Sequence, residues 1–175
     1  MAEAGGASLR FRGRVHKLGD NVDTDQIIPA PYLKDLSPEN LAAHVLEGAD
    51  PSFPRRIRPG DIVLGGRNFG SGSSREHAPM ALRYAGVRVV MALSFARIFY
   101  RNAVDGGHLI PVIVTEEAYR GIGDGDEVEV DLESSIVRDL TAGAEYPVER
   151  FPRLIARIVQ AGGIFSVGDL SSLEA

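Results

Sequence analysis

The sequence predicts an α/β fold with a parallel βαβαβ centre and an antiparallel extension. Between residues 61 and 114, three short apolar segments alternate with two segments of helical spacing. This order is typical of parallel strands joined by right-handed crossover helices. After residue 125, short segments of alternating polarity are separated by turn residues, which indicates antiparallel strands. A chain of 175 residues, 44% of them apolar, is long enough to bury a core.

We expect a single domain over residues 9–175, preceded by a disordered tail over residues 1–8. The tail, MAEAGGAS, consists mostly of small and polar residues, which bury too little apolar surface to order themselves. From residue 9 onwards, no stretch has the composition of an interdomain linker.

The first third of the domain is predicted to hold one strand, one helix and two loops. Residues 9–18 alternate apolar and basic side chains, which indicates a half-exposed strand. Residues 19–36 contain prolines and several turn formers, and are expected to form a long loop. Ser37 precedes a proline and predicts the N-cap of a short helix that runs to about Leu46. Residues 47–61 are proline-rich and predict a second loop.

The parallel centre is predicted as strand, helix, strand, helix and strand over residues 61–66, 78–84, 87–93, 95–104 and 109–114. Gly86 is expected to end the first helix, and Ser94 to cap the start of the second.

The remaining residues are predicted to form an antiparallel extension and a closing helix. The strands are expected over residues 126–132, 135–140 and 145–149. Residues 148–163 have amphipathic helical spacing, and the apolar face is expected to carry Phe151, Leu154, Ile155 and Ile158. A short helical turn is expected over residues 166–173.

Composition excludes several classes of function. The net charge of −5 makes nucleic acid an unfavourable partner, and no apolar run approaches the roughly 20 residues needed to span a membrane. The N-terminus lacks the charged-then-apolar pattern of a secretory signal, so we expect a cytoplasmic protein. The chain has no cysteine and only four scattered histidines, so no metal site is expected on it.

Two loops are predicted to meet where ligands bind in α/β sheets, at the carboxyl ends of parallel strands. The first follows strand 61–66 and the second follows strand 87–93. Together they carry Ser71, Ser73, Ser74, Arg75, Ser94 and Arg97. Two guanidinium groups and several hydroxyls at one edge would bind an anion, and a helix N-terminus behind the serines would favour its charge.

The same residues also allow a purely structural interpretation. Ser73 and Glu76 have the S-x-x-E spacing of a capping box, so the glycine-rich loop GSGSSREH can also be explained as a capped helix start. A dinucleotide fingerprint is absent because Arg75 stands where the third glycine is required. His77, inside the predicted helix start, is expected to be a packed histidine rather than a catalyst.

Three longer motifs, GDNVDTDQIIP, GRNFGSGSSREHAPMAL and SFARIFYRNAVDGGHLIPV, follow one another along the chain. They resemble the motifs of small subunits of the aconitase superfamily, and the resemblance covers residues 9–165. It implies a swivelling β/β/α fold, equivalent to the mobile fourth domain of single-chain aconitases. It also implies a partner, the large subunit, whose cysteines hold a 4Fe–4S cluster. A chain without cysteine would then supply only part of the active site.

The resemblance implies a hydro-lyase that dehydrates and rehydrates a hydroxy diacid. It makes Ser73 the candidate catalytic base, Ser74 part of an anion-binding backbone, and Arg75 the clamp on a substrate carboxylate. Arg97, in the neighbouring loop, is the second candidate cation for the substrate. A further family motif matches Asp23, Thr24 and Asp25, which are expected to shape the rim of the site.

Within the superfamily, the chain is most similar to small subunits of 3-isopropylmalate dehydratases, which act in leucine biosynthesis. Small subunits of homoaconitase and 2,3-dimethylmalate dehydratase are alternatives, and a non-catalytic anion-binding module is a third interpretation. The segment with Tyr32, Leu33 and Lys34 is expected to reach over the variable arm of the substrate. Lys34 would suit a carboxylate arm, or would lie in solvent over Leu33. The sequence is compatible with self-association of the isolated chain, and does not fix the stoichiometry of the complex.

Overall fold

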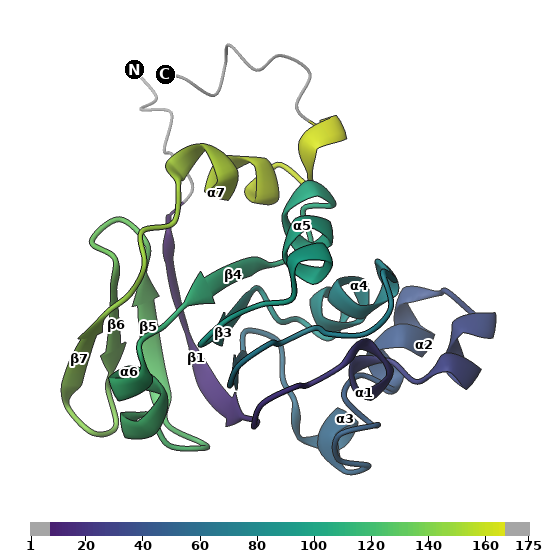
Figure 1. Cartoon of the computed structure of the whole chain (residues 1–175), viewed down its shortest axis with the longest axis horizontal. Coiled ribbons are helices and arrows are strands. Elements are labelled where there is room, and N and C mark those ends of the chain that lie inside the picture. The colour runs from purple at the N-terminus through teal and green to yellow at the C-terminus, as the bar shows by residue number, and fades with distance from the viewer. Residues whose placement is uncertain (1–7, 167–175) are drawn as a thin grey trace.

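The computed structural model describes residues 8–166 and contains one mixed sheet within that range (Figure 1). The strands lie in the order β4-β3-β2-β1-β5-β6-β7. Their bounds are β1 (Arg10–Lys17), β2 (Ile62–Gly65), β3 (Val89–Ala92), β4 (Ile110–Ile113), β5 (Glu127–Asp131), β6 (Ile136–Asp139) and β7 (Ala144–Pro147). β1 to β4 are parallel and β5 to β7 antiparallel. The predicted α/β class, with its parallel centre and antiparallel extension, is confirmed.

Strand β1 joins the two parts of the sheet. Its second half pairs parallel with β2, with Val15 opposite Ile62. Its first half pairs antiparallel with β5, with Arg10 opposite Asp131. Gly13 lies where β1 passes close to the turn before β2, because a Cβ placed there would stand 2.0 Å from the carbonyl oxygen of Gly60.

Helices cover both faces of the sheet. Their bounds are α1 (Thr24–Ile27), α2 (Pro38–Ala43), α3 (Phe53–Arg56), α4 (His77–Tyr84), α5 (Arg97–Asp105), α6 (Glu116–Gly121) and α7 (Arg153–Gln160). Two 3-10 helices are η1 (Ala30–Lys34) and η2 (Ile164–Ser166). Figure 1 shows α1, α2 and α3 gathered at one end of the molecule, and α6 beside β5, β6 and β7 at the other. The helices α4 and α5 are the predicted crossovers between parallel strands.

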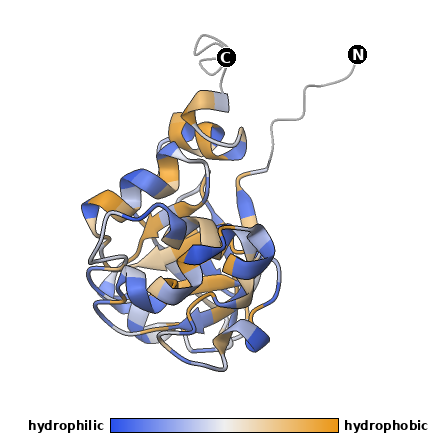
Figure 2. Ribbon diagram, turned by 90° about the vertical axis from the view of Figure 1, so that its right-hand side faces the viewer, coloured by the Kyte–Doolittle hydropathy of each residue, from blue (hydrophilic) through white to orange (hydrophobic). Residues whose placement is uncertain are grey.

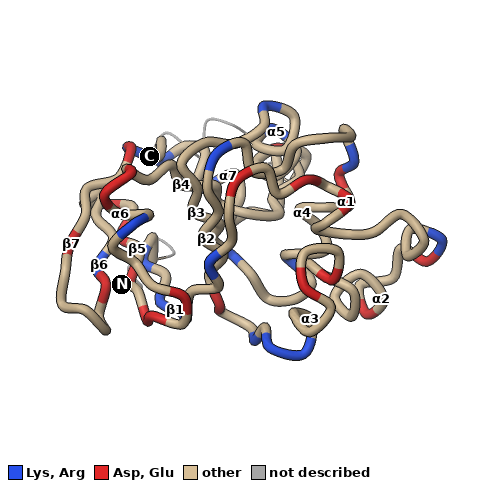
Figure 3. The backbone as a smooth tube through the Cα atoms, turned by 60° about the horizontal axis from the view of Figure 1, so that its bottom comes forward, with Lys and Arg blue, Asp and Glu red and all other residues tan. Residues whose placement is uncertain are grey.

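The core has two parts, one on each face of the sheet. Successive residues of a strand point to opposite faces, so Val63 and Val90 pack with α1 to α5, whereas Leu64 and Met91 pack with α6, α7 and the antiparallel strands. The central strands are largely hydrophobic in Figure 2, and Figure 3 shows acidic and basic residues interspersed along the backbone.

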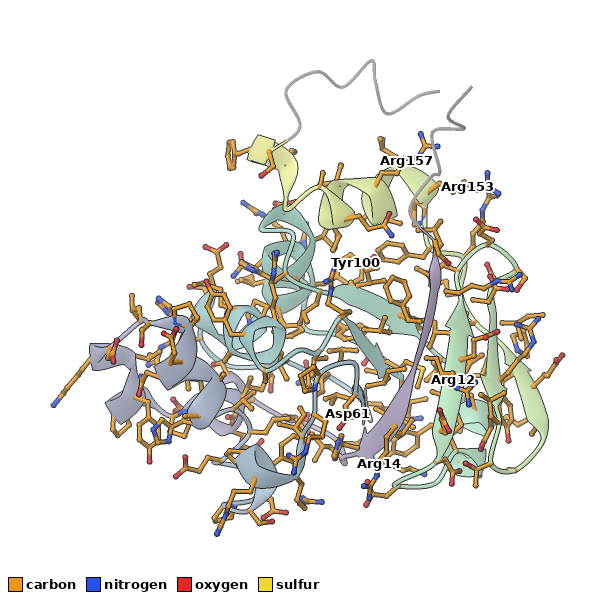
Figure 4. The ribbon with its side chains drawn as sticks, turned by 180° about the vertical axis from the view of Figure 1, so that it is seen from behind. Arg12, Arg14, Asp61, Tyr100, Arg153 and Arg157 are labelled. Carbon is orange, nitrogen blue, oxygen red and sulfur yellow. The ribbon has the colours of Figure 1, made fainter. Side chains whose placement is uncertain are left out.

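A buried polar pair lies beneath the end of β1. His16 Nε2 is 2.7 Å from Asp61 Oδ2, and the same oxygen accepts the backbone N–H of Arg58 at 2.9 Å. His16 is 3% exposed and its ring contacts Phe53 of α3. Figure 4 shows Asp61 beside β1, on the segment that leads into β2. The pair ties the turn before β2 to the strand that joins both parts of the sheet.

Several predicted boundaries are wrong, and short helices account for most of the differences. The expected loop 19–36 contains α1 and η1, and the second expected loop contains α3. Helix α6, with Thr115 as its N-cap, was not predicted. Helix α2 begins after Ser37, as predicted, but ends at Ala43.

Two predicted features of the helices are also corrected. Ser94 does not cap α5, since its hydroxyl accepts the backbone N–H of Asn68 at 2.8 Å, and the helix begins at Arg97 after Ala96. The apolar face of α7 differs from the prediction because Leu154 is 46% exposed, while Ala156 and Val159 are buried.

Some predictions concern residues outside the described range. The tail over residues 1–8 lies outside it except for residue 8, and the helical turn over residues 166–173 lies outside it except for residue 166. Among the residues that are described, no helix is long and apolar enough to cross a membrane.

Candidate active site

The loops that follow β2 and β3 lie side by side, as the parallel topology predicted. Phe69 and Phe95 form a parallel bridge. The backbone N–H of Phe69 donates to the carbonyl of Ser94 at 3.0 Å, and Ala96 N–H donates back to Phe69 at 2.8 Å. The serine-rich segment and the start of α5 therefore meet at the carboxyl edge of the sheet, where a ligand is expected.

A third segment, at the start of α1, joins these two loops. Asp23 forms a parallel bridge with Ser71, and Thr24 N–H donates to the carbonyl of Ser71 at 2.8 Å. Asp23 and Gln26 form a capping box that fixes the first turn of α1. The local sequence thus builds a rigid turn whose N-terminal residues are held against the serine loop.

Thr24 contacts the candidate base directly. Its side chain is buried at 3% exposure. Thr24 Oγ1 accepts the backbone N–H of Ser73 at 3.2 Å and lies 3.5 Å from Ser73 Oγ, to which it donates. Ser73 itself is exposed. A hydroxyl that receives a hydrogen bond holds negative charge better than one that receives none, because the bond favours the ionised form.

Arg75 and Asp25 form an ion pair across the two segments. Arg75 Nη1 lies 3.1 Å from Asp25 Oδ1, with side-chain exposures of 34% and 68%. An exposed pair of this kind contributes at most about 1 kcal/mol. The guanidinium is therefore held against Asp25, the neighbour of Thr24 in the chain, by a pair weak enough for another carboxylate to replace Asp25.

The predicted helix start at the serines is wrong. Helix α4 begins at His77, and its N-cap, Glu76, makes no side-chain cap hydrogen bond. The capping box is absent because its two members have other partners. Ser73 is bonded to Thr24, and the Glu76 carboxylate lies 3.0 Å from His108 Nε2. Ser73 and Ser74 thus lie in an irregular segment ahead of the helix rather than in its first turn.

Arg97 lies in the first turn of α5, next to the loop that carries Phe95. It is exposed, and within residues 8–166 the structure gives it no hydrogen bond or ion pair. Arg97 therefore lies on the element that adjoins the serine loop, while the contacts to that loop come from other residues. Two of these residues, Asn102 and His108, were not predicted from the sequence to contact the loop.

Tyr32 and Leu33 are partly buried and pack against the core of this chain, whereas Lys34 is exposed. Tyr32 O–H donates to Glu47 Oε1 at 2.9 Å, and its ring stacks on His44 with 3.5 Å between ring centroids. The hydrogen bond to Glu47 raises the pKa of Tyr32, and the hydrogen bond to His44 lowers the pKa of Glu47. Leu33 packs against the core, and Lys34 is exposed.

The described residues offer no set of ligands for a metal. They contain no group of three or more His, Cys, Asp or Glu side chains that could hold an ion. The absence of cysteine from the whole sequence leaves no thiolate for an iron–sulfur cluster, so such a cluster does not fit this chain. Taken alone, the site combines a hydroxyl, a guanidinium and a buried hydrogen-bond donor, which suit an anion and a proton transfer.

Known proteins share this fold and sequence over most of the chain. Residues 50–117 match the family described as the aconitase C-terminal domain. The chain is 52% identical over 159 residues to the 3-isopropylmalate dehydratase small subunit of Aquifex aeolicus, spanning 90% of this chain and 94% of that one. It is 53% identical over 154 residues to the methanogen homoaconitase small subunit of Methanothermobacter thermautotrophicus, spanning 88% of each.

A solved structure with the same type of name as these relatives has a similar fold. The crystal structure of 3-isopropylmalate dehydratase from Methanocaldococcus jannaschii superposes with a TM-score of 0.84 at 44% identity, over 90% of this chain and 92% of that one. The fold and the site thus define a domain of the aconitase superfamily, of the swivelling β/β/α type. At these identities and coverages, the chain belongs to the family of 3-isopropylmalate dehydratase small subunits.

Proposed function

We propose that this chain is the small subunit of a hydro-lyase that interconverts 2-isopropylmalate and 3-isopropylmalate. The observation that carries the proposal is the contact of Ser73 with buried Thr24, beside Arg75, at the carboxyl edge of the sheet. A hydroxyl that abstracts a proton next to a carboxylate needs a donor to stabilise its charge and a cation to fix the substrate. Both are present around Ser73.

Ser73 is the proposed base. Its ionised Oγ takes the proton from the carbon next to a carboxylate, and the C–H electrons form the double bond as the neighbouring C–OH bond breaks. The hydroxyl departs as hydroxide with the C–O electron pair. Hydroxide then adds to the carbon that lost the proton, and Ser73 returns the proton to the carbon that lost the hydroxyl, so that Oγ is ionised again. Thr24 holds the charge on Oγ during this exchange, since it donates towards that atom.

Arg75, Ser74 and Arg97 are the proposed substrate-binding residues. A substrate carboxylate takes the place of Asp25 on the Arg75 guanidinium, whose planar fork matches it. Ser74 lies next to the base in the same exposed segment. Arg97 has no partner within residues 8–166 and would receive the second carboxylate of the diacid. The rim is formed by Asp23, Thr24 and Asp25.

The partner is the cluster-bearing large subunit. Relatives are named as small subunits, and the ligands for an iron–sulfur cluster must come from another chain. In the complex, the partner's 4Fe–4S cluster would supply Lewis-acid chemistry for the departing hydroxyl. The residues of this chain bind and orient the diacid and move the proton.

A homoaconitase-type substrate is the second candidate. The outward position of Lys34 suits the longer carboxylate arm of such a diacid, and a methanogen homoaconitase small subunit is 53% identical. A 2,3-dimethylmalate dehydratase would use the same site with a smaller arm. Lys34→Val discriminates these substrates: it should lower kcat/KM for homoisocitrate by about tenfold and leave the isopropylmalate value unchanged.

The proposal is tested by mixing this chain with its large subunit under anaerobic conditions. We expect no turnover by either subunit alone and turnover of isopropylmalate by the mixture. Ser73→Ala should lower kcat by about 100-fold or more while the complex still forms. Full activity of Ser73→Ala would remove Ser73 as the base, and absence of turnover with every diacid would overturn the proposed function.

A further inference from the structure

The motif that follows β3, SFARIFYRNAVDGGHLIPV, brings two further residues to the site besides Arg97. Asn102, on α5, donates from Nδ2 to the carbonyl oxygen of Ser74 at 3.1 Å. His108, after the glycines that end α5, lies with Nε2 3.0 Å from Glu76 Oε1. Both partners belong to the irregular segment that carries Ser73 and Arg75.

This segment is held by side chains rather than by regular structure. Among the described residues, the backbone of residues 72–75 makes two hydrogen bonds, one from Ser73 N–H to Thr24 and one from Asn102 to Ser74. The Glu76 contact with His108 fixes the next residue before α4 begins. Thr24 therefore holds one side of the segment, and Asn102 and His108 hold the other.

The local packing makes room for the Glu76–His108 contact. A Cβ on Gly106 would stand 2.3 Å from His108 Nε2 and 2.7 Å from Glu76 Oε1. Gly106 has a right-handed helical backbone (φ −79°), so space alone explains the glycine at this position. The motif NAVDGGH thus supplies the Asn102 donor to Ser74, the His108 contact with Glu76, and a glycine at position 106 that leaves space for that contact.

The His108 ring is suited to donate to Glu76. Its side chain is 12% exposed, and Nδ1 is buried without a hydrogen-bond partner. A proton on Nδ1 would leave a buried N–H unpaired, which is costly. The tautomer with its proton on Nε2 avoids this cost and donates to the Glu76 carboxylate.

We propose that Asn102 and His108 are positioning residues that hold Ser74 to Glu76 in one conformation and so direct Ser73 and Arg75 towards the substrate. Neither residue touches the reacting atoms. The consequence for turnover rests on the proposed function, whereas the hold on the segment does not. Displacement of a reacting group by about 1 Å can lower turnover by about 100-fold, so a small loss of order here has a large effect.

The first experiment measures order without substrate or partner. Backbone order parameters from 15N relaxation are compared for the isolated wild-type chain, Asn102→Ala and Gly106→Ala. We expect values for residues 73–76 to fall from about 0.85 towards 0.6 or below in both variants. Matched controls are Arg101→Ala, one residue away with a largely exposed side chain, and Gly19→Ala, where an added Cβ meets nothing within 4 Å.

The second experiment measures turnover in the complex with the large subunit. Asn102→Ala and Gly106→Ala should lower kcat/KM by about tenfold or more, with unchanged Tm and unchanged assembly. Glu76→Gln keeps an oxygen acceptor for His108 and should stay near wild type, whereas Glu76→Ala should resemble Gly106→Ala. Rescue by the isosteric amide separates positioning from a need for charge.

The two experiments distinguish the outcomes. Unchanged order in Asn102→Ala and Gly106→Ala overturns the proposal, and so does lost order with unaltered turnover. If the wild-type complex turns over no diacid, the proposed function fails, while the relaxation data still decide whether Asn102 and His108 hold the segment.

Discussion

Thr24 Oγ1 contacts Ser73 at two atoms, lying 3.2 Å from its amide nitrogen and 3.5 Å from its hydroxyl oxygen. One side chain thus fixes the backbone of Ser73 and donates to the oxygen that we propose as the base. Thr24 is 3% exposed, so its hydroxyl is held in place by the surrounding core, while Ser73 itself is exposed.

Thr24→Val should lower kcat by about 100-fold, the scale seen when one donor to a developing oxyanion is removed. The substitution keeps the shape of the side chain and removes both hydrogen bonds to Ser73. Thr24→Ser, which keeps the hydroxyl, is the matched control and should stay close to wild type. Initial rates in the complex check this, and equal losses in the two variants would assign Thr24 a packing role alone.

Asp25→Asn should strengthen the binding of a diacid to the isolated chain. The exposed pair with Arg75 contributes at most about 1 kcal/mol, so releasing the guanidinium should tighten Kd by up to about fivefold. Calorimetric titration with malate measures this change. The gain should shrink as salt is added, because ions screen exposed charges. Weaker binding by Asp25→Asn would show that Asp25 positions Arg75 rather than competing for it.

Gly13→Ala should destabilise the fold. The added Cβ would stand 2.0 Å from the carbonyl oxygen of Gly60, so two backbone segments must separate, at a cost of about 1–3 kcal/mol. Urea denaturation measures the loss. Gly19→Ala has nothing within 4 Å of its added Cβ and should unfold at nearly the wild-type midpoint; a similar loss there would point to a general effect of removing glycine.

Asp139 and Asp131 should respond oppositely to substitution by asparagine. Burial, together with the Asp126 carboxyl, raises the pKa of Asp139. Burial also acts to raise the pKa of Asp131, but backbone donors at Ser134 and Glu133 outweigh it and lower that pKa.

The signs of these shifts fix the direction of each effect. Because folding raises the pKa of Asp139, the contribution of this residue to stability is fully present below its unfolded pKa. That contribution is lost as the pH rises through its folded pKa. Asp139→Asn should therefore raise Tm at pH 7, and this gain should disappear in acid. Asp131 has the lowered pKa, so Asp131→Asn should lower Tm at pH 7. Thermal unfolding between pH 3 and pH 8 checks both, and a loss of stability at pH 7 in Asp139→Asn would contradict the first.

The parallel arrangement of the central strands was predictable from the sequence, because strands that alternate with helices leave a strong periodic signal. The loops after β2 and β3 had to meet once the strands were parallel, and Ser73 and Arg75 were found from their motif. Their roles stay predictions that the experiments above address.

Competition between hydrogen-bond partners explains where prediction from sequence failed. Ser94 was expected to cap α5, but its hydroxyl accepts the Asn68 N–H from another loop. The Ser73–Glu76 capping box was lost to Thr24 and His108, which lie far away in sequence. Such choices depend on tertiary neighbours. Helix α1 is different, because the spacing of Asp23 and Gln26 is a capping signal within the local sequence. This helix could therefore have been predicted without knowledge of the tertiary neighbours.

The position of β1 between two halves of the sheet also bears on the order of synthesis. The strand emerges early, yet its first half can pair only after β5, which ends at Asp131, has been made. Chains leave the ribosome at about 5–20 residues per second, so the edge of β1 waits unpaired for several seconds. Arg10, Arg12 and Arg14 stand on that half of the strand, and charged side chains on an open edge discourage pairing with other chains. We therefore expect the basic alternation of β1 to disfavour aggregation of the nascent protein until its partner strand has been made.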